Sequence, residues 1–181
     1  MTVRKILRIG EPSLLKKSTA LSEFNTTWLD ELVQDLWQTM HAQNGAGLAA
    51  PQIGVNRRIV VFGIEQNSRY PEAPEIPPTV LINPLIECLD ETLIEDWEGC
   101  LSVPQMRAKV PRYRKIRYRG MNQQGELLVR EVSDFHARVV QHECDHLDGI
   151  LYPQRIRDMT TFGFRDELEK SGRLCLQPCD D

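Results

Sequence analysis

Hydrophobic residues recur with a helical period near the start of the chain, between about residues 26 and 42. Spacings of three and four place such residues on one face of an α-helix. Thr26 or Thr27 can cap the first turn, because a hydroxyl oxygen accepts a hydrogen bond from a free backbone N–H. The residues that form the apolar stripe are Trp28, Leu29, Leu32, Val33, Leu36, Trp37 and Met40. The pattern predicts an amphipathic helix that ends before a loop at 44–47.

The middle of the chain is dominated by segments typical of β-strands. Residues 57–64 (RRIVVFGI) are rich in β-branched residues, and further strands are predicted at 79–84, 85–99, 107–121 and 126–132. The sequence MNQQG at 121–125 predicts a hairpin turn before the last of these strands. The segment 65–78 contains four prolines. Because proline cannot donate a hydrogen bond to a sheet, we expect an exposed loop there.

Two more helices are predicted toward the end of the chain, at about 134–147 and 158–170. In the first, Phe135, Val139 and Val140 provide an apolar face, and Gly149 is a stop signal. Strands in the middle with helices at both ends predict an α+β fold. We expect antiparallel or mixed strands packed around the helix at 134–147, in a single domain covering 1–172. Periodicity is weak after 172, so the tail at 173–181 is expected to be mobile.

Composition narrows the class of protein. The chain has 181 residues, of which 41% are hydrophobic and 27% charged, which suits a single globular domain. Its net charge of −4 gives no general reason to expect binding to DNA, RNA or a membrane. The first residues do not resemble a secretory signal, and no apolar run approaches the ~20 residues of a membrane span. We therefore expect a cytoplasmic protein. Its five cysteines should be reduced there, free to act as metal ligands or nucleophiles.

The candidate chemistry begins in residues 141–149, QHECDHLDG. This segment contains the motif HExxH, with His142 and His146 four residues apart and Glu143 beside the first. Residues i and i+4 share a face of a helix, so both imidazoles could bind one metal ion. The alternative is a pair of surface histidines on an ordinary helix.

Two histidines leave a metal site without its third protein ligand. One class of protease supplies it by extending the motif to HExxHxxGxxH, but Tyr152 stands where that histidine would be. Another class uses a glutamate on a later helix, for which Glu167 and Glu169 are the candidates. Upstream, Cys100 in EGCLS (98–102) would complete a His₂Cys site with one position open for water. A buried, inert cysteine explains Cys100 equally well, and the local sequence leaves both readings open.

A glycine-rich segment, GAGLAAPQ at 45–52, is the third candidate feature. Small residues let backbone N–H groups approach a bound substrate closely, and Gln52 adds an amide donor. A helix cap followed by a turn is the simpler explanation, for which Gly45 alone would suffice.

Taken together, GAGLAAPQIG, EGCLS and QHECDHLDG resemble the peptide deformylase family, whose pattern is GxGLAAxQ, EGCLS and QHExDHL. The resemblance extends from about residue 7 to about residue 152. It implies a metal-dependent hydrolase that removes the formyl group from N-formylmethionyl nascent polypeptides, giving formate and a free N-terminal methionine. It also implies Fe²⁺ as the natural ion, with Ni²⁺, Co²⁺ or Zn²⁺ able to replace it.

The resemblance also implies roles for individual residues. It implies that the metal ligands are Cys100, His142 and His146. Glu143 would take a proton from water and later pass it to the departing amine. Gln52 and the backbone N–H of Leu101 would stabilise the oxyanion. The residues implied to contact the peptide are Gly45, Gly47, Glu98, Gly99, Arg107, Phe135 and Val139, and the position of Leu48 suggests that it lies near the formyl group.

Arg138 departs from some relatives, which carry an aliphatic residue at this position. Its long cationic side chain could narrow the pocket for the methionine side chain or extend outward into solvent.

Two other function classes fit parts of the sequence. A general zinc aminopeptidase or endopeptidase would use a downstream ligand such as Glu167 in place of Cys100. A non-catalytic binding module would be expected to lack Glu143 or Gln52, and both are present. The segment 107–119 contains seven cations, which could contact ribosomal RNA near the exit tunnel. A solvated strand face is the favoured interpretation, because charge runs usually face water.

Overall fold

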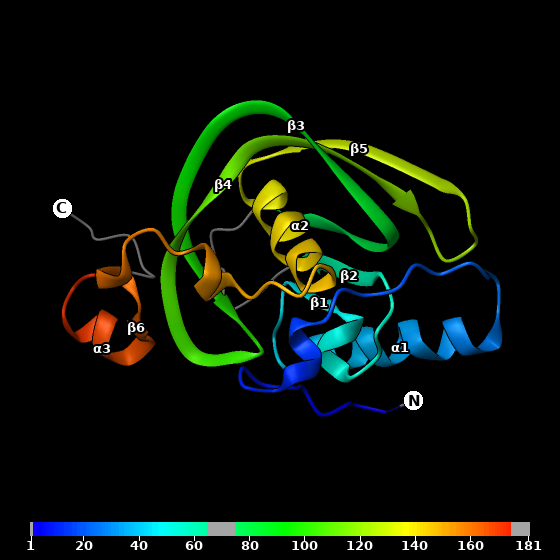
Figure 1. Ribbon diagram of the computed structural model, residues 1–181, viewed down its shortest axis with the longest axis horizontal. Helices are drawn as coiled ribbons and strands as arrows, with labels where there is room; N and C mark the ends of the chain where they lie inside the picture. Colours follow the sequence, from blue (N-terminus) through cyan, green and yellow to red (C-terminus); the bar gives the residue numbers. More distant parts are fainter. Residues whose placement is uncertain (1, 65–74, 175–181) are drawn as a thin grey trace.

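The computed structural model describes residues 2–64 and 75–174. It has an α+β architecture, as predicted (Figure 1). The helices are α1 (Thr27–Ala42), α2 (Asp134–Leu147) and α3 (Arg165–Lys170). The strands are β1 (Gly47–Ala49), β2 (Ile59–Ile64), β3 (Ile76–Cys100), β4 (Val103–Met121), β5 (Leu127–Ser133) and β6 (Gly163–Phe164). Short 3₁₀ helices lie at Pro12–Leu15, Ala50–Ile53, Tyr152–Arg155 and Met159–Thr161.

The strands form one antiparallel sheet in the order β1-β2-β3-β4-β5, and β6 pairs with β4. The β3–β4 hairpin is long and curves over α2 (Figure 1). Its pairing register shifts between Ile82 and Leu85, and again on both sides of Asp90. Such irregularities bend a strand and increase its twist. The bend brings the end of the hairpin, at Cys100, beside α2.

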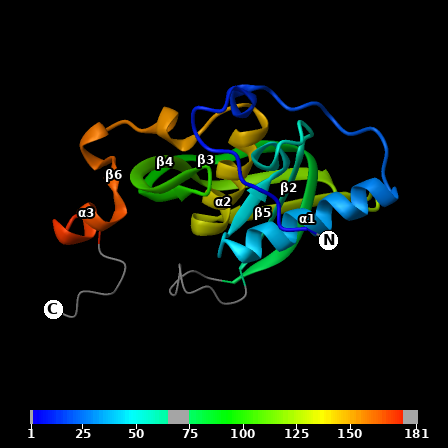
Figure 2. The ribbon, with the colours of Figure 1, turned by 90° about the horizontal axis from the view of Figure 1, so that it is seen from below.

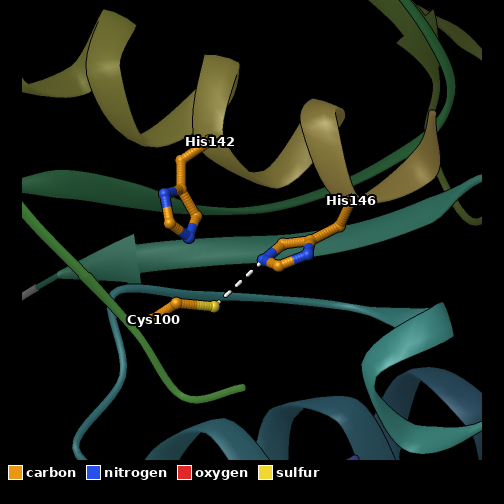
Figure 3. Close-up of side chains that lie close together, drawn as sticks. All are labelled: Cys100, His142 and His146. Carbon is orange, nitrogen blue, oxygen red and sulfur yellow. Dashed lines mark hydrogen bonds between the residues drawn. The ribbon is translucent and has the colours of Figure 1, made fainter. Parts of the chain in front are cut away.

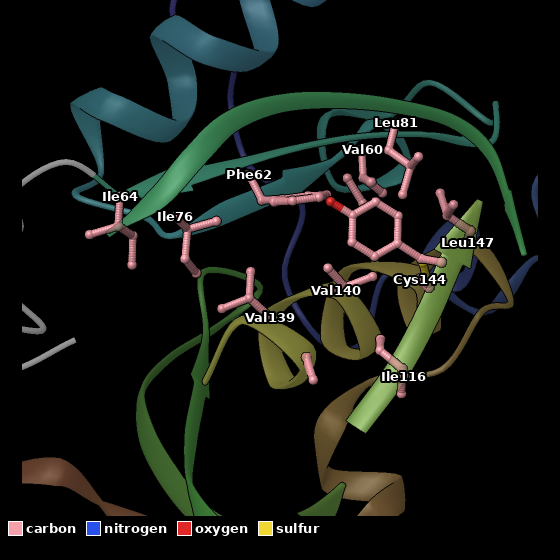
Figure 4. Packing of buried hydrophobic residues seen from close by; sticks show 13 residues of the cluster. Val60, Phe62, Ile64, Ile76, Leu81, Ile116, Val139, Val140, Cys144 and Leu147 are labelled. Atoms are coloured by element: carbon pink, nitrogen blue, oxygen red, sulfur yellow. The ribbon is translucent and has the colours of Figure 1, made fainter. Parts of the chain in front are cut away.

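Strand β2 lies between the two main helices. Val60 and Phe62 pack in the cluster that contains the buried face of α2, whereas Ile59 and Val61 pack in the cluster that contains α1. Burial on both faces explains why this strand is a continuous apolar run. Figure 4 shows the cluster on the α2 side, where the helix contributes Val139, Val140, Cys144 and Leu147. The sheet therefore holds α2 firmly in position.

The predictions for the two long helices are confirmed. The side chain of Thr26 accepts a hydrogen bond of 3.2 Å from the backbone N–H of Leu29 and caps α1. Helix α2 covers the predicted 134–147. Beyond it, Gly149 has a φ of +73°, and a Cβ there would lie 2.4 Å from the carbonyl oxygen of Leu15. The helix thus stops where the chain must pass close to another backbone.

The predicted loop at 65–78 is wrong for its last residues, because β3 already begins at Ile76. Residues 65–74 lie outside the described part of the chain. The register of the β2–β3 pair shifts between Phe62 and Ile64, at Gly63. A Cβ on Gly63 would lie 2.9 Å from Cα of Pro78, so the glycine makes room for the proline. Such an irregular place in a ladder tolerates residues that lack an N–H.

The predicted helix at 158–170 is divided into three pieces. The side chain of Asp158 accepts a hydrogen bond from the backbone N–H of Thr160 and caps a 3₁₀ turn. Strand β6 then pairs with Met106 and Arg107 of β4, and α3 begins only at Arg165. A pairing partner distant in the sequence overrides the helical pattern, which local periodicity could not show.

At the end of the described residues, Leu174 is buried, and its backbone N–H donates to the carbonyl of Leu168. Residues 175–181, with Cys175 and Cys179, lie outside the described part, so the division into a domain at 1–172 and a tail stays a prediction. No helix in residues 2–64 and 75–174 is long and apolar enough to cross a membrane.

Candidate metal and catalytic site

Three potential metal ligands meet where the end of β3 faces α2. The rings of His142 and His146 lie one helical turn apart, with centroids 5.1 Å from each other. Sγ of Cys100 lies 3.2 Å from Nε2 of His146 (Figure 3). Ligand atoms of the three residues all lie within 4.8 Å of one another. Two imidazoles and a thiolate suit a divalent transition metal, so the donor set fits the implied ion.

The surroundings of Cys100 favour its thiolate. Burial by itself raises the pKa of this thiol, but the neighbouring His146 and His142 outweigh burial and hold the pKa well below its usual value. The backbone N–H of Ser102 also donates to Sγ over 3.4 Å. A thiolate is the form that binds a metal ion, so this environment favours a metal ligand over an inert core cysteine.

Glu98 orients the first histidine. Nδ1 of His142 donates to the Glu98 carboxylate over 2.8 Å, which leaves Nε2 for a metal ion. The Glu98 carboxylate is buried and receives two hydrogen bonds from Arg112, of 2.9 and 3.0 Å. Burial raises its pKa, but Arg112 and His142 lower it more, so the group is ionised. Glu98 also lines the pocket, as predicted, although its hydrogen bonds go to protein groups.

The ionic network extends beyond the predicted residues. Arg112 also donates to Asp145 over 2.5 Å, and Asp145 accepts two further hydrogen bonds from Arg155. The sequence indicates Arg112 only as one of the seven basic residues at 107–119. Asp145 lies three residues after His142, which places the two side chains near each other on the helix. This spacing is the feature of the sequence that points to Asp145 as a neighbour of the site.

Arg138 does not extend into solvent. Its guanidinium is buried and donates to Glu98 over 2.8 Å, to the Val110 carbonyl over 2.7 Å and to the Ile94 carbonyl over 2.7 Å. Because a desolvated cation needs such acceptors, the side chain turns inward toward β3 and β4. Arg138 also lines the pocket and thereby takes part in its wall.

Glu143 lies buried in the wall of the pocket, against Gly47. A Cβ on Gly47 would lie 2.5 Å from Oε1 of Glu143, so the close approach requires glycine. Within the described residues, Oε2 of Glu143 has no hydrogen-bond partner. Burial raises the pKa of this carboxyl to about 7, against the opposing effect of His142 and His146. A carboxyl group with such a pKa and an available oxygen suits proton transfer near neutral pH.

The side-chain amide of Gln52 has a fixed orientation. Its Oε1 accepts a hydrogen bond of 2.8 Å from the backbone N–H of Ala49. Nε2 is therefore turned toward the metal-ligand cluster, where it lies 3.1 Å from Oγ of Ser102 and 3.5 Å from Sγ of Cys100. The amide donor thus lies in the wall of the pocket, next to Cys100.

A pocket beside these groups collects most of the predicted site. It is lined by Gly45, Ala46, Gly47, Gln52, Trp97, Glu98, Gly99, Cys100, Leu101, Phe135, Arg138, Val139, His142 and Glu143. His146 adjoins the pocket as part of the metal-ligand cluster. Arg107 lies across Gly99, since a Cβ there would lie 1.8 Å from its Nη1. Arg107 is not itself a lining residue, and Leu48 is buried in the cluster around α1 and does not line the pocket either.

The downstream glutamates lie outside this cluster. Glu167 and Glu169 are exposed on α3, where they pair with Lys170 and Arg165. They are not part of the group of side chains that could hold a metal ion. The structure therefore does not place Glu167 or Glu169 where either could act as the third metal ligand of a general peptidase.

Four of the seven cations at 107–119, namely Arg112, Arg114, Lys115 and Arg117, form ion pairs with acidic residues. Arg112 is buried in the network around Glu98, and Arg114 pairs with Asp134. Arg117 contacts both Glu87 and Glu131 on the outer face of the sheet. These contacts support the interpretation of a solvated strand face.

A His₂Cys cluster beside a buried carboxyl group and an open pocket defines the class as a metal-dependent hydrolase. The chain belongs to the polypeptide deformylase family, whose sequence model matches residues 3–162. Enzymes of this family remove the N-formyl group from nascent polypeptides, and the chain is an amide hydrolase of protein biosynthesis.

Individual relatives agree over most of their length. Peptide deformylase 1 of Nitrosomonas europaea is 54% identical over 166 residues, which cover 92% of this chain and 94% of the relative. The Met-Ala-Ser-bound class I type b peptide deformylase of Acinetobacter baumannii has a TM-score of 0.83 at 38% identity, covering 86% of this chain and 99% of that one. The peptide deformylase of Thermotoga maritima has a TM-score of 0.78 at 32% identity, covering 87% and 100%.

Proposed function

We propose that this chain removes the formyl group from N-formylmethionyl nascent polypeptides in the cytoplasm, using a metal ion held by Cys100, His142 and His146. The observation that carries the proposal is the approach of the Cys100 sulfur to the two histidines, next to the buried carboxyl of Glu143. When bound, a divalent metal ion acidifies a water molecule and polarises the formyl carbonyl.

Glu143 moves the proton in this reaction. Its Oε2 accepts a proton from the attacking water and then donates it to the nitrogen of the departing amine. Burial raises the pKa of the Glu143 carboxyl to about 7, which supports a role in proton transfer. Water oxygen joins the formyl carbon, the C–N bond breaks, and the products are formate and a free N-terminal methionine.

Two donors stabilise the negative charge that develops on the formyl oxygen. They are Nε2 of Gln52, whose orientation is set by Ala49, and the backbone N–H of Leu101. Removing one such donor typically lowers the rate by ~10²–10³. The position of Gln52 Nε2 near Cys100 supports this role.

The peptide is proposed to lie between β1 and the end of β3 as an added strand. Gly45, Gly47 and Gly99 supply backbone that a peptide can approach closely, and all three line the pocket. Phe135 and Val139 supply an apolar wall for the methionine side chain. Arg107, lying across Gly99, borders the same edge. A relative of this chain was solved with Met-Ala-Ser bound, which would be a product of such a reaction.

We propose Fe²⁺ as the native ion, with Ni²⁺, Co²⁺ or Zn²⁺ able to replace it, because imidazole and thiolate donors suit all four. Anaerobic purification followed by elemental analysis and a formate-release assay on formyl-Met-Ala-Ser tests ion and reaction together. We expect about one iron per chain and release of formate. Metal-loaded protein that releases no formate would contradict the proposed function.

We also propose contact with the ribosome near the exit tunnel, although ion pairs within the protein neutralise four of the seven cations at 107–119. Co-sedimentation with ribosomes at increasing salt tests it, since phosphate contacts weaken with salt. If neutralising Arg114, Lys115 and Arg117 leaves binding unchanged, this segment does not contact ribosomal RNA.

A further inference from the structure

A second groove, of about 880 Å³, adjoins the pocket and shares Cys100 and Leu101 with it. One wall is the N-terminal segment, which lies next to the end of the β3–β4 hairpin (Figure 1). That wall includes Arg4, Lys5 and Arg8, and Pro104 with Gln105 lies in the wall formed by the hairpin. The two cavities therefore form one continuous surface past the metal-ligand cluster.

Backbone hydrogen bonds fix the N-terminal wall against the catalytic residues. The N–H of Leu7 donates to the carbonyl of Gln52, and the N–H of Ile9 donates to the carbonyl of Ser102, each over 2.8 Å. The segment also runs along α1 (Figure 2), where the N–H of Arg4 donates to Thr39 over 2.9 Å. The cations on this segment are thus held at a set position relative to Gln52 and Cys100.

The groove has an excess of positive charge, although the whole chain has a net charge of −4. Arg4 pairs with Asp35. Lys5 and Arg8 are exposed and form no ion pair with any residue of the described ranges. The one acidic residue in the wall is Glu11, whose carboxylate accepts hydrogen bonds from Ser13. Two cations are therefore available to an anionic ligand next to the pocket.

We propose that this groove binds the part of the nascent polypeptide that follows the residues held in the pocket, and that Lys5 and Arg8 favour acidic side chains there. This inference rests on the proposed function, because a polypeptide substrate must leave the pocket along some surface. An extended chain advances about 3.3 Å per residue, so positions soon after the third residue would reach the adjoining groove. Carboxylate side chains complement the exposed cations Lys5 and Arg8.

The test compares two long substrates that share the sequence formyl-Met-Ala-Ser and continue with either four glutamates or four lysines. For each enzyme the readout is the ratio of kcat/KM for the acidic over the basic substrate at low salt. This ratio does not depend on the fraction of active protein. Wild type should prefer the acidic substrate by about 3- to 10-fold, chiefly through KM, because exposed pairs are individually weak. The preference should shrink as salt is added.

The variant Lys5→Glu/Arg8→Glu should abolish or reverse the ratio. The matched control is Lys16→Glu/Lys17→Glu, which changes the net charge equally at exposed positions outside the groove and should keep the wild-type ratio. An unchanged ratio in Lys5→Glu/Arg8→Glu would overturn the proposal. An equal loss of the preference in Lys5→Glu/Arg8→Glu and in the control would also overturn it, because that result would show an effect of net charge alone. The tripeptide formyl-Met-Ala-Ser is measured in parallel, and its failure to react with wild-type enzyme would contradict the proposed function itself.

Discussion

At the scale of single residues, Gly47 sets where the catalytic carboxyl can lie. A methyl group at this position would lie 2.5 Å from Oε1 of Glu143 and would have to displace it. We therefore expect Gly47→Ala to lower kcat at least ~100-fold, since small displacements of a catalytic group have effects of this size. The control Gly163→Ala adds the same methyl group in ordinary contact with Leu168 and should react normally. Near-normal kcat in Gly47→Ala would show that Glu143 tolerates displacement.

Cys100 is predicted to be indispensable for binding the metal ion. The variant Cys100→Ser replaces the thiolate by a hydroxyl group that does not ionise near neutral pH, so metal content and turnover should both collapse. Elemental analysis and formate release measure the two effects. The control Cys88→Ser changes an exposed thiol and should alter neither. Full metal occupancy with normal turnover in Cys100→Ser would refute the ligand assignment.

Glu143 is predicted to transfer protons without binding the metal. Glu143→Ala should retain the ion and still bind the product Met-Ala-Ser, while kcat falls by ~10²–10⁴, the usual effect of losing a general base. Metal analysis, product binding and kcat are measured on one preparation. Loss of the ion would mean that this carboxyl is a ligand.

At the scale of elements, Arg138 joins α2 to both strands of the long hairpin. Its guanidinium bonds Glu98 and the carbonyls of Ile94 and Val110. Arg138→Met leaves these buried acceptors with fewer partners, so we expect the free energy of unfolding to fall by roughly 3–5 kcal/mol. The midpoint of urea unfolding measures it. The control Arg114→Met removes only an exposed ion pair with Asp134, so its free energy of unfolding should change little. An equal decrease in the free energy of unfolding of the two variants would contradict the prediction.

The sequence predicts the two long helices and the motif residues of the site, but it does not predict the ionic partners of Glu98. Helices α1 and α2 follow from periodicity because each is amphipathic by itself. The three motifs locate most of the residues that the structure brings together at the candidate site, because each proposed role needs one residue type at one spacing. The partnership of Arg112 with Glu98 and Asp145 could not be predicted, since it depends on the curvature and register of the β3–β4 hairpin. The irregular register of this hairpin bends its strands, and local periodicity does not show where such irregularities fall.

At the scale of the whole molecule, the site must accept a formyl group and refuse larger acyl groups. The proposed metal ligands Cys100 and His142 line the pocket together with Glu98, and contacts with Arg112 and His142 hold Glu98 in place. A rigid wall cannot move to make room for an extra methyl group. The free-energy difference between formyl and acetyl substrates should therefore reach the upper end of the ~1–3 kcal/mol that one methyl group is usually worth. We expect kcat/KM for acetyl-Met peptides to be at least ~100-fold lower than for formyl-Met peptides, or about 2.7 kcal/mol.

The same comparison should show methionine preferred over charged residues next to the formyl group, because Phe135 and Val139 line an apolar pocket. Matched formyl and acetyl peptides measured on one enzyme preparation decide the question of size. Comparable kcat/KM values would indicate a roomy site and favour a general peptidase.

The joining of Cys100 and His146 also has a thermodynamic consequence. These residues are 46 positions apart in the sequence and belong to a hairpin and a helix that meet only in the folded chain. An ion bound between them acts as a reversible crosslink, and its binding free energy adds to the stability of the native state. Oxidation of the Cys100 sulfur would remove one anchor of that crosslink. Catalytic inactivation and loss of conformational stability would then be a single event, and the inactivated enzyme would also be the form most open to degradation.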